Sequence, residues 1–171
     1  MRTVVVVGNP RPQSRTRLVA ELVADKVATA FGAEHDLTVD LCDYAADLFR
    51  WPDENLSSLS ARVAQADLLV VASPTYKGAY TGMLKSFLDR YPSGGLAGVT
   101  AIPVMTGADA LHSLTLNFTL CPLLIELGAT VPMQGLYFQI SQMNAAHSVV
   151  DKWAAENLNR AFWRGRPSVP D

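Results

Sequence analysis

Residues 8–16, "GNPRPQSRT", follow directly on the apolar run "VVVV" and include two hydroxyl side chains and two arginines. If a helix begins near Ser14, its free backbone N–H groups and the positive end of its dipole point toward this loop. Together with Arg11 and Arg15, these groups suit a terminal phosphate monoester. The loop alone leaves a simpler alternative open, in which Ser14 only caps the helix and the arginines are solvated.

The same loop lacks the glycines of two familiar phosphate-binding motifs. It contains neither GxxxxGK[ST], which binds nucleoside triphosphates, nor GxGxxG, which lets a dinucleotide pyrophosphate lie against bare backbone. Pro10 and Pro12 stiffen the turn and limit close approach of its backbone. The pattern therefore favours a single phosphate held by hydroxyls and arginine.

A second polar turn, residues 73–81, follows the apolar run "LLVVA". A flat conjugated ring could lie across Pro74 and Tyr76, with the backbone N–H groups of residues 77–79 facing its edge. The residues leave open that Tyr76 and Tyr80 are ordinary half-buried loop aromatics.

A third turn, "TGADALH", could donate backbone N–H groups of residues 106–108 to a ring carbonyl. His112 could face the same ligand, although a lone histidine on a helix is more often structural. A Ser-His-Asp hydrolase that uses Ser14 or Ser73 with His112 is disfavoured, because the chain has no GxSxG motif.

These turns are positioned by an alternation of strands and helices. Strands are predicted at 3–7, 34–41, 67–72, 100–105 and about 134–139, and helices at 15–31, 81–91, 109–127 and 145–163. Three of the strands are continuous apolar runs, as in parallel strands covered on both faces. The alternation predicts a doubly wound α/β sheet, whose ligands bind outside the carboxyl ends of its strands.

Two segments depart from this regular pattern. Residues 42–56 are predicted to be a partly irregular surface excursion, with Phe49 and Trp51 covering an edge. Pro122 cannot donate to the carbonyl of Phe118 four residues earlier, so the helix at 109–127 is expected to kink or open there.

Composition limits the class of protein. The 171 residues are 49% apolar and 18% charged, with a formal net charge of −2, which predicts one domain over 1–171 and no nucleic-acid partner. Apolar runs fall far short of the roughly 20 residues that cross a bilayer, and the N-terminus is unlike a signal peptide. We therefore expect no membrane partner and a cytoplasmic location. Cys42 and Cys121 are expected to be free thiols, with no metal site.

The chain resembles the NAD(P)H-dependent FMN reductases of flavodoxin-like fold, and in particular the reductase components of two-component alkanesulfonate-type monooxygenases. The resemblance rests on "GNPRPQSRTRL", "ADLLVVASPTYKGAYTGMLKSFLD" and "TGADALHSL...CPLL". It implies a three-layer sandwich with a five-stranded parallel sheet of order 2-1-3-4-5 and helices on both faces. The FMN-binding positions that it implies are Asn9, Arg11, Ser14, Arg15, Thr16, Pro74, Thr75, Tyr76, Lys77, Gly78, Thr106, Gly107 and Ala108.

The resemblance also implies an assembly. Family members form dimers or tetramers with the flavin near a subunit boundary, which makes Tyr80, Trp51 and the helix around Phe118 candidates for the contact. The family often has Tyr at the position of Phe118, so loss of that hydroxyl is expected to alter oligomer packing or flavin release.

The implied activity is hydride transfer from NADPH or NADH to FMN, with the reduced flavin passed to a partner monooxygenase. No catalytic side chain is needed, because the cofactor carries the chemistry. Two alternatives remain: a reductase of quinones or azo dyes that keeps FMN tightly bound, and a non-catalytic electron carrier of the flavodoxin type. The carrier normally has a strongly acidic surface, so the charge of −2 disfavours it.

Overall fold

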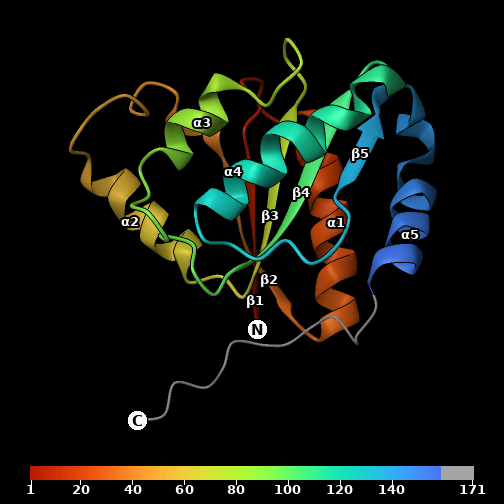
Figure 1. Ribbon diagram of the computed structural model, residues 1–171, viewed down its shortest axis with the longest axis horizontal. Helices are drawn as coiled ribbons and strands as arrows, with labels where there is room; N and C mark the ends of the chain where they lie inside the picture. The colour runs from red at the N-terminus through yellow and green to blue at the C-terminus, as the bar shows by residue number, and fades with distance from the viewer. Residues whose placement is uncertain (159–171) are drawn as a thin grey trace.

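The computed structural model describes residues 1–158, in which a central sheet separates two layers of helices (Figure 1). The strands are β1 (Arg2–Val7), β2 (Glu34–Asp40), β3 (Leu68–Pro74), β4 (Thr100–Gly107) and β5 (Leu136–Gln139). They form one parallel sheet in the order β2-β1-β3-β4-β5. The predicted fold class and strand order are therefore confirmed.

The longer helices divide between the two faces of the sheet. One face is covered by α1 (Arg15–Phe31) and α5 (Ala146–Asn157), and the other by α2 (Glu54–Ala64), α3 (Gly82–Leu88) and α4 (Cys121–Glu126). Four short helical segments complete the described chain: η1 (Leu41–Tyr44), η2 (Ala110–Ser113), η3 (Leu116–Leu120) and η4 (Ile140–Ala145).

Strand β1 explains why both faces need a helical layer. Val4 and Val6 pack into the core beneath α2, α3 and α4, whereas Val5 and Val7 pack against α1 and α5. Successive side chains of a strand point to opposite faces, so an unbroken valine run is apolar on both. All four valines are almost completely buried, which anchors the loop at residues 8–14 to the rigid centre of the sheet.

The long helix predicted at 109–127 is wrong as a single element. The segment instead contains η2, the π-helical η3 and α4. Pro122 has no N–H for the carbonyl of Phe118, and the N–H of Cys121 bonds to the carbonyl of Leu116 five residues earlier. The expected local opening of the helix before Pro122 is thereby confirmed.

The excursion at 42–56 is confirmed as mostly irregular, but its end contains the start of a helix that the sequence prediction missed. Helix α2 begins after Asp53, whose carboxylate accepts a hydrogen bond from the N–H of Leu56 at 2.9 Å. Phe49 and Trp51 are 80% and 58% exposed, so they do not cover an edge of the sheet in this chain. The guanidinium of Arg90 instead lies over the ring of Trp51, with its central carbon 4.3 Å from the centre of that ring.

Other boundaries shift modestly. Helix α3 is shorter than the predicted 81–91. Helix α5 ends at Asn157, and positions 159–163 of the helix predicted at 145–163 lie outside the described residues.

Three further findings bear on the composition. No helix in the described part of the chain is both long and apolar enough to cross a membrane. Within residues 1–158, no three or more His, Cys, Asp or Glu side chains gather in a way that could hold a metal ion. Cys42 and Cys121 are free, half-buried thiols, as predicted.

Candidate functional site

The three polar turns meet at the carboxyl edge of the sheet, where they line a cleft with a volume of about 500 Å3. Such edges are where ligands bind in open α/β sheets. The cleft brings together every predicted position except Lys77 and Gly78. Its lining residues are Asn9, Arg11, Pro12, Gln13, Ser14, Arg15, Thr16, Pro74, Thr75, Tyr76, Thr106, Gly107, Ala108 and Ile140.

A buried chain of hydrogen bonds connects the first and third turns. The side-chain amide of Asn9 donates to the hydroxyl of Thr16 at 2.9 Å, and this hydroxyl lies 2.7 Å from that of Thr106. All three side chains are at least nine-tenths buried. The hydroxyl of Thr16 therefore cross-links the loops, and its backbone N–H is the group left to meet a ligand.

The second turn is tied to both of its neighbours. The N–H of Thr75 donates to the carbonyl of Thr106 at 2.7 Å. The hydroxyl of Thr81 donates to the carbonyl of Gly8 and accepts from the N–H of Leu84, so it caps α3 as well. The floor of the cleft is consequently fixed before any ligand binds.

The first turn presents the donors of an anion site. The hydroxyl oxygen of Ser14 accepts from the N–H of Arg17 at 3.1 Å, which leaves its own proton available to a ligand. The backbone N–H groups of Arg15 and Thr16 lie in the first turn of α1, where a helix offers them no acceptor. Ser14 is thus a helix cap, as the simpler alternative held, in a geometry that still favours an anion.

The arginines of this region differ in their availability. Arg17 is engaged with Glu21 at 3.0 Å and lies 3.6 Å from the carboxylate of Asp40. Arg11 and Arg15 are exposed at the cleft and form no ion pair with any other described residue. They are the cations free to meet a phosphate.

Gln13 lines the cleft and was not among the predicted positions. Its φ of +50° places a residue other than glycine in the left-handed region, which costs about 1 kcal/mol. Strained backbone of this kind concentrates at ligand-binding loops. The signal in the sequence was only its place between Pro12 and Ser14.

Lys77 and Gly78 form the tip of a tight hairpin rather than a wall of the cleft. Tyr76 and Ala79 exchange two backbone hydrogen bonds across this tip, of 2.8 and 3.1 Å. Both tip residues have positive φ, as a two-residue hairpin of this type requires. The N–H of Ala79 is therefore committed to Tyr76, and the N–H groups of the two tip residues are those left exposed.

His112 and Ile140 complete the account of the site. His112 is exposed on η2 and does not line the cleft, whereas Ile140, which was not among the predicted positions, closes its β5 side. An apolar residue directly after the last strand was the available signal for Ile140.

The donors and surfaces of the cleft fit a flavin mononucleotide. Free N–H groups, a hydroxyl and two arginines stand at the α1 end, matching a terminal phosphate. Pro74 and the half-exposed ring of Tyr76 offer apolar surface in the middle. At the β4 end, Ala108 lines the cleft, and its N–H makes no hydrogen bond with another described residue, so it can meet a ring carbonyl.

The sheet order defines a flavodoxin-like α/β protein, with a cleft at the carboxyl edge of its sheet. Residues 1–144 match the sequence family described as NADPH-dependent FMN reductase. The chain belongs to this family, which is a family of oxidoreductases.

Known relatives agree with this assignment. The chain is 30% identical to the FMN reductase (NADPH) of Escherichia coli K12, over 86% of this chain and 78% of that protein. It is 28% identical to the NADH-dependent FMN reductase SfnF of Pseudomonas putida, over 95% and 89% of the two chains. Among solved structures, the apo form of the NADH:FMN oxidoreductase EmoB superimposes with a TM-score of 0.76 at 27% identity, covering 91% of this chain and 89% of that one.

Proposed function

We propose that this protein is an NAD(P)H-dependent FMN reductase of one flavodoxin-like domain, and that FMN binds in the cleft at the carboxyl edge of the sheet. The observation that carries the proposal is the coincidence of unpaired donors and free arginines at one end of the cleft with the unpaired backbone N–H of Ala108 at the other. A mononucleotide with a polar ring edge needs both ends.

Each turn has a separate task. Ser14, Arg11, Arg15 and the N–H of Thr16 bind the phosphate. Pro74, Thr75 and Tyr76 bound the space for the ring, while Thr106, Gly107 and Ala108 meet its polar edge. Bound FMN would supply the chemistry by accepting hydride from the nicotinamide. Backbone donors at the ring edge would stabilise the negative charge that reduction places there.

No side chain of the cleft is assigned a proton-transfer role. The exposed His112 lies outside the cleft, and hydride transfer to a flavin needs neither a nucleophile nor a metal from the protein. The work of the chain is to bind and orient two ligands.

We further propose a homodimer or homotetramer and a partner monooxygenase that consumes the reduced flavin. The apolar side chains Leu111, Leu114, Phe118 and Ile125 are between 59% and 83% exposed along η2, η3 and α4, which is unusual for a surface without a partner. The relatives are named as FMN reductases that use NADPH or NADH, which supports FMN and these nicotinamide nucleotides as the substrates. Nicotinamide nucleotides are cytoplasmic reductants, which supports the expected location.

Flavin retention tests the function. The purified protein is examined for a visible flavin spectrum, and oxidation of NADPH and NADH is followed with and without added FMN. A colourless protein whose oxidation of NAD(P)H requires added FMN supports the proposal. A yellow protein that keeps FMN through dialysis and reduces quinones or azo dyes unaided supports the tightly bound alternative, and FMN binding without any nicotinamide oxidation supports the carrier.

A further inference from the structure

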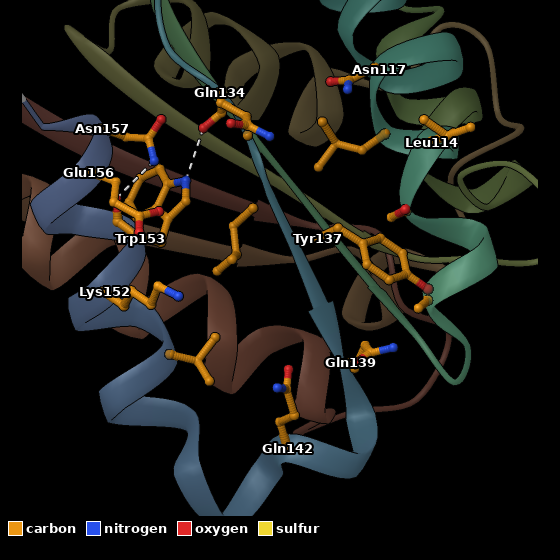
Figure 2. Close-up of a pocket in the computed structure, with 16 residues that line it drawn as sticks. Leu114, Asn117, Gln134, Tyr137, Gln139, Gln142, Lys152, Trp153, Glu156 and Asn157 are labelled. Atoms are coloured by element: carbon orange, nitrogen blue, oxygen red, sulfur yellow. Dashed lines mark hydrogen bonds between the residues drawn. The ribbon is translucent and has the colours of Figure 1, made fainter.

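The phenol of Tyr137 spans the space between the edge strand β5 and the turn that follows β4. Its hydroxyl donates to the backbone carbonyl of Asp109 at 2.7 Å. Figure 2 shows the ring pointing away from β5 toward that turn, on one wall of a cavity of about 470 Å3 beside β5. Tyr137 is not among the residues that line the flavin cleft, so any effect on the flavin must pass through the turn.

Gly107 is shaped to receive this phenol. A Cβ atom at Gly107 would lie 1.9 Å from the hydroxyl oxygen of Tyr137, closer than any real contact. The glycine thus provides space here rather than conformational freedom. Because Gly107 also lines the cleft, the phenol packs directly behind the wall that faces the proposed flavin ring.

The backbone carbonyl of Asp109 accepts two hydrogen bonds, one from Tyr137 and one from the N–H of His112 at 3.2 Å. The side-chain carboxylate of Asp109 accepts from the N–H of Leu111 at 2.9 Å. The N–H groups of Ala108 and Asp109 make no hydrogen bond with another described residue. Holding the carbonyl of Asp109 fixes the plane of the peptide unit that joins Asp109 to Ala110, because each peptide unit is rigid. The contact of the phenol with Gly107 restrains the turn from its other end.

We propose that Tyr137 is a positioning residue for the flavin ring, holding the turn at 107–109 so that the free N–H of Ala108, which lines the cleft, faces the ring edge. The inference rests on the proposed function. It assigns Tyr137 no contact with FMN and no part in hydride transfer.

The hydroxyl is also kept in the form that can donate. Burial raises the pKa of Tyr137 above its ordinary value, and the negative charge of Asp109 acts in the same direction, whereas the hydroxyl of Thr75 acts in the opposite direction. The phenol therefore remains protonated throughout the neutral range.

The test replaces Tyr137→Phe, which keeps the ring and removes only the donor. The matched control is Tyr91→Phe, which removes a hydroxyl donating to the carbonyl of Ser60 at 3.1 Å, remote from the cleft. Dissociation constants for FMN and riboflavin are measured by fluorescence titration. Y137F is expected to raise both constants by a similar factor of about three to ten, the worth of one hydrogen bond, with kcat at saturating FMN within about twofold of wild type. Y91F should change neither constant.

Three results would overturn the proposal: unchanged flavin affinity in Y137F, an equal loss in Y91F, or a loss confined to FMN, which would implicate the phosphate loop. Hydrogen–deuterium exchange of the flavin-free protein gives a second readout that needs no ligand. Y137F should speed exchange in a peptide covering residues 106–112. Unchanged exchange there would contradict the proposal that Tyr137 holds this turn. If wild type binds no flavin, the proposed function fails while this exchange experiment still tests the role of Tyr137 in the turn.

Discussion

Ser14 can cap α1 and bind an anion at once, because the two roles use different parts of its hydroxyl. The oxygen accepts from the N–H of Arg17, while the proton remains free to donate. The sequence left open whether this residue is a helix cap or part of an anion site, and the structure allows both roles at once. A phosphate-binding site differs from a mere helix cap in that the neighbouring cation Arg11 also binds the phosphate.

Replacing Ser14 and Arg11 together by Ala is expected to weaken FMN binding at least about tenfold, because charge-assisted hydrogen bonds are worth about 1.5–3 kcal/mol. Riboflavin, which lacks the phosphate, should bind nearly as it does to wild type. Titration of each flavin against both proteins measures the difference. The control is Asp53→Ala, which removes the N-cap of the remote helix α2. Equal losses for FMN and riboflavin would show that this loop does not read the phosphate.

Thr16 contributes chiefly to stability. Its hydroxyl lies between the amide of Asn9 and the hydroxyl of Thr106 in a region closed to water. Thr16→Val keeps the shape but leaves these partners unsatisfied, so the free energy of unfolding should fall by about 1–3 kcal/mol. Urea denaturation measures the loss.

Thr29→Val on the same helix is the matched control. The hydroxyl of Thr29 bonds to the carbonyl of Asp25 in an exposed turn, so its loss should change stability by less than about 0.5 kcal/mol. Comparable losses in both variants would mean that the buried chain between the first and third turns carries no special weight.

At the scale of elements, the π-helix η3 contributes an aromatic side chain to the exposed apolar surface. Its residue Phe118 is 75% exposed, although its neighbours Leu116 and Leu120 are buried. A side chain so placed contributes little to the core of one subunit. If the assembly proposed above uses this surface, Phe118 is its most prominent aromatic residue.

Phe118→Ser should therefore shift the protein toward smaller species, raising the dissociation constant between subunits by about 30-fold, the equivalent of about 2 kcal/mol for a buried aromatic anchor. Sedimentation velocity measures the shift. The comparison variant is Phe49→Ser, which removes an equally exposed ring from the excursion at 42–56. Dissociation in F49S but not in F118S would place the contact elsewhere.

At the scale of the whole molecule, ionisation of a thiol makes folding sensitive to alkaline pH. Burial first, and then the carboxylates of Asp40 and Asp43, raise the pKa of Cys42 from 9.0 to about 11. The unfolded chain loses this proton near pH 9, before the folded chain does. The free energy of unfolding should therefore fall as pH rises from about 9 to about 11. Below about pH 9 the ionisation of Cys42 should not change it.

The measurement is the urea midpoint of wild type and Cys42→Ala at steps between about pH 8 and pH 11. The variant should lose less stability across this window than wild type. Raised pKa values of Tyr91 and Tyr137 act in the same direction, so some decline should remain. Identical declines in the two proteins would show that Cys42 ionises freely when folded.

Local sequence was sufficient for the elements whose signals are local. Unbroken apolar runs predicted the parallel strands, and Ser14 marked the start of α1 as the structure has it. The missing N–H of Pro122 predicted the opening of the long helix. Helix α2 was missed although the sequence carries a signal for it: Leu56, Leu59 and Val63 have the spacing of one face of a helix, and Asp53 is a typical N-cap.

By itself, the sequence determined the sheet, its edge and the residue types that reach that edge, because strand periodicity and turn chemistry depend on neighbours along the chain. Only the tertiary structure decided how those residues divide their work. It committed the hydroxyl of Thr16 to Asn9 and Thr106, moved Lys77 and Gly78 to a hairpin tip, and brought Tyr137 against Gly107. The contacts of Thr16 with Thr106 and of Tyr137 with Gly107 join segments that lie tens of residues apart, and they are fixed by strand register and packing rather than by local pattern.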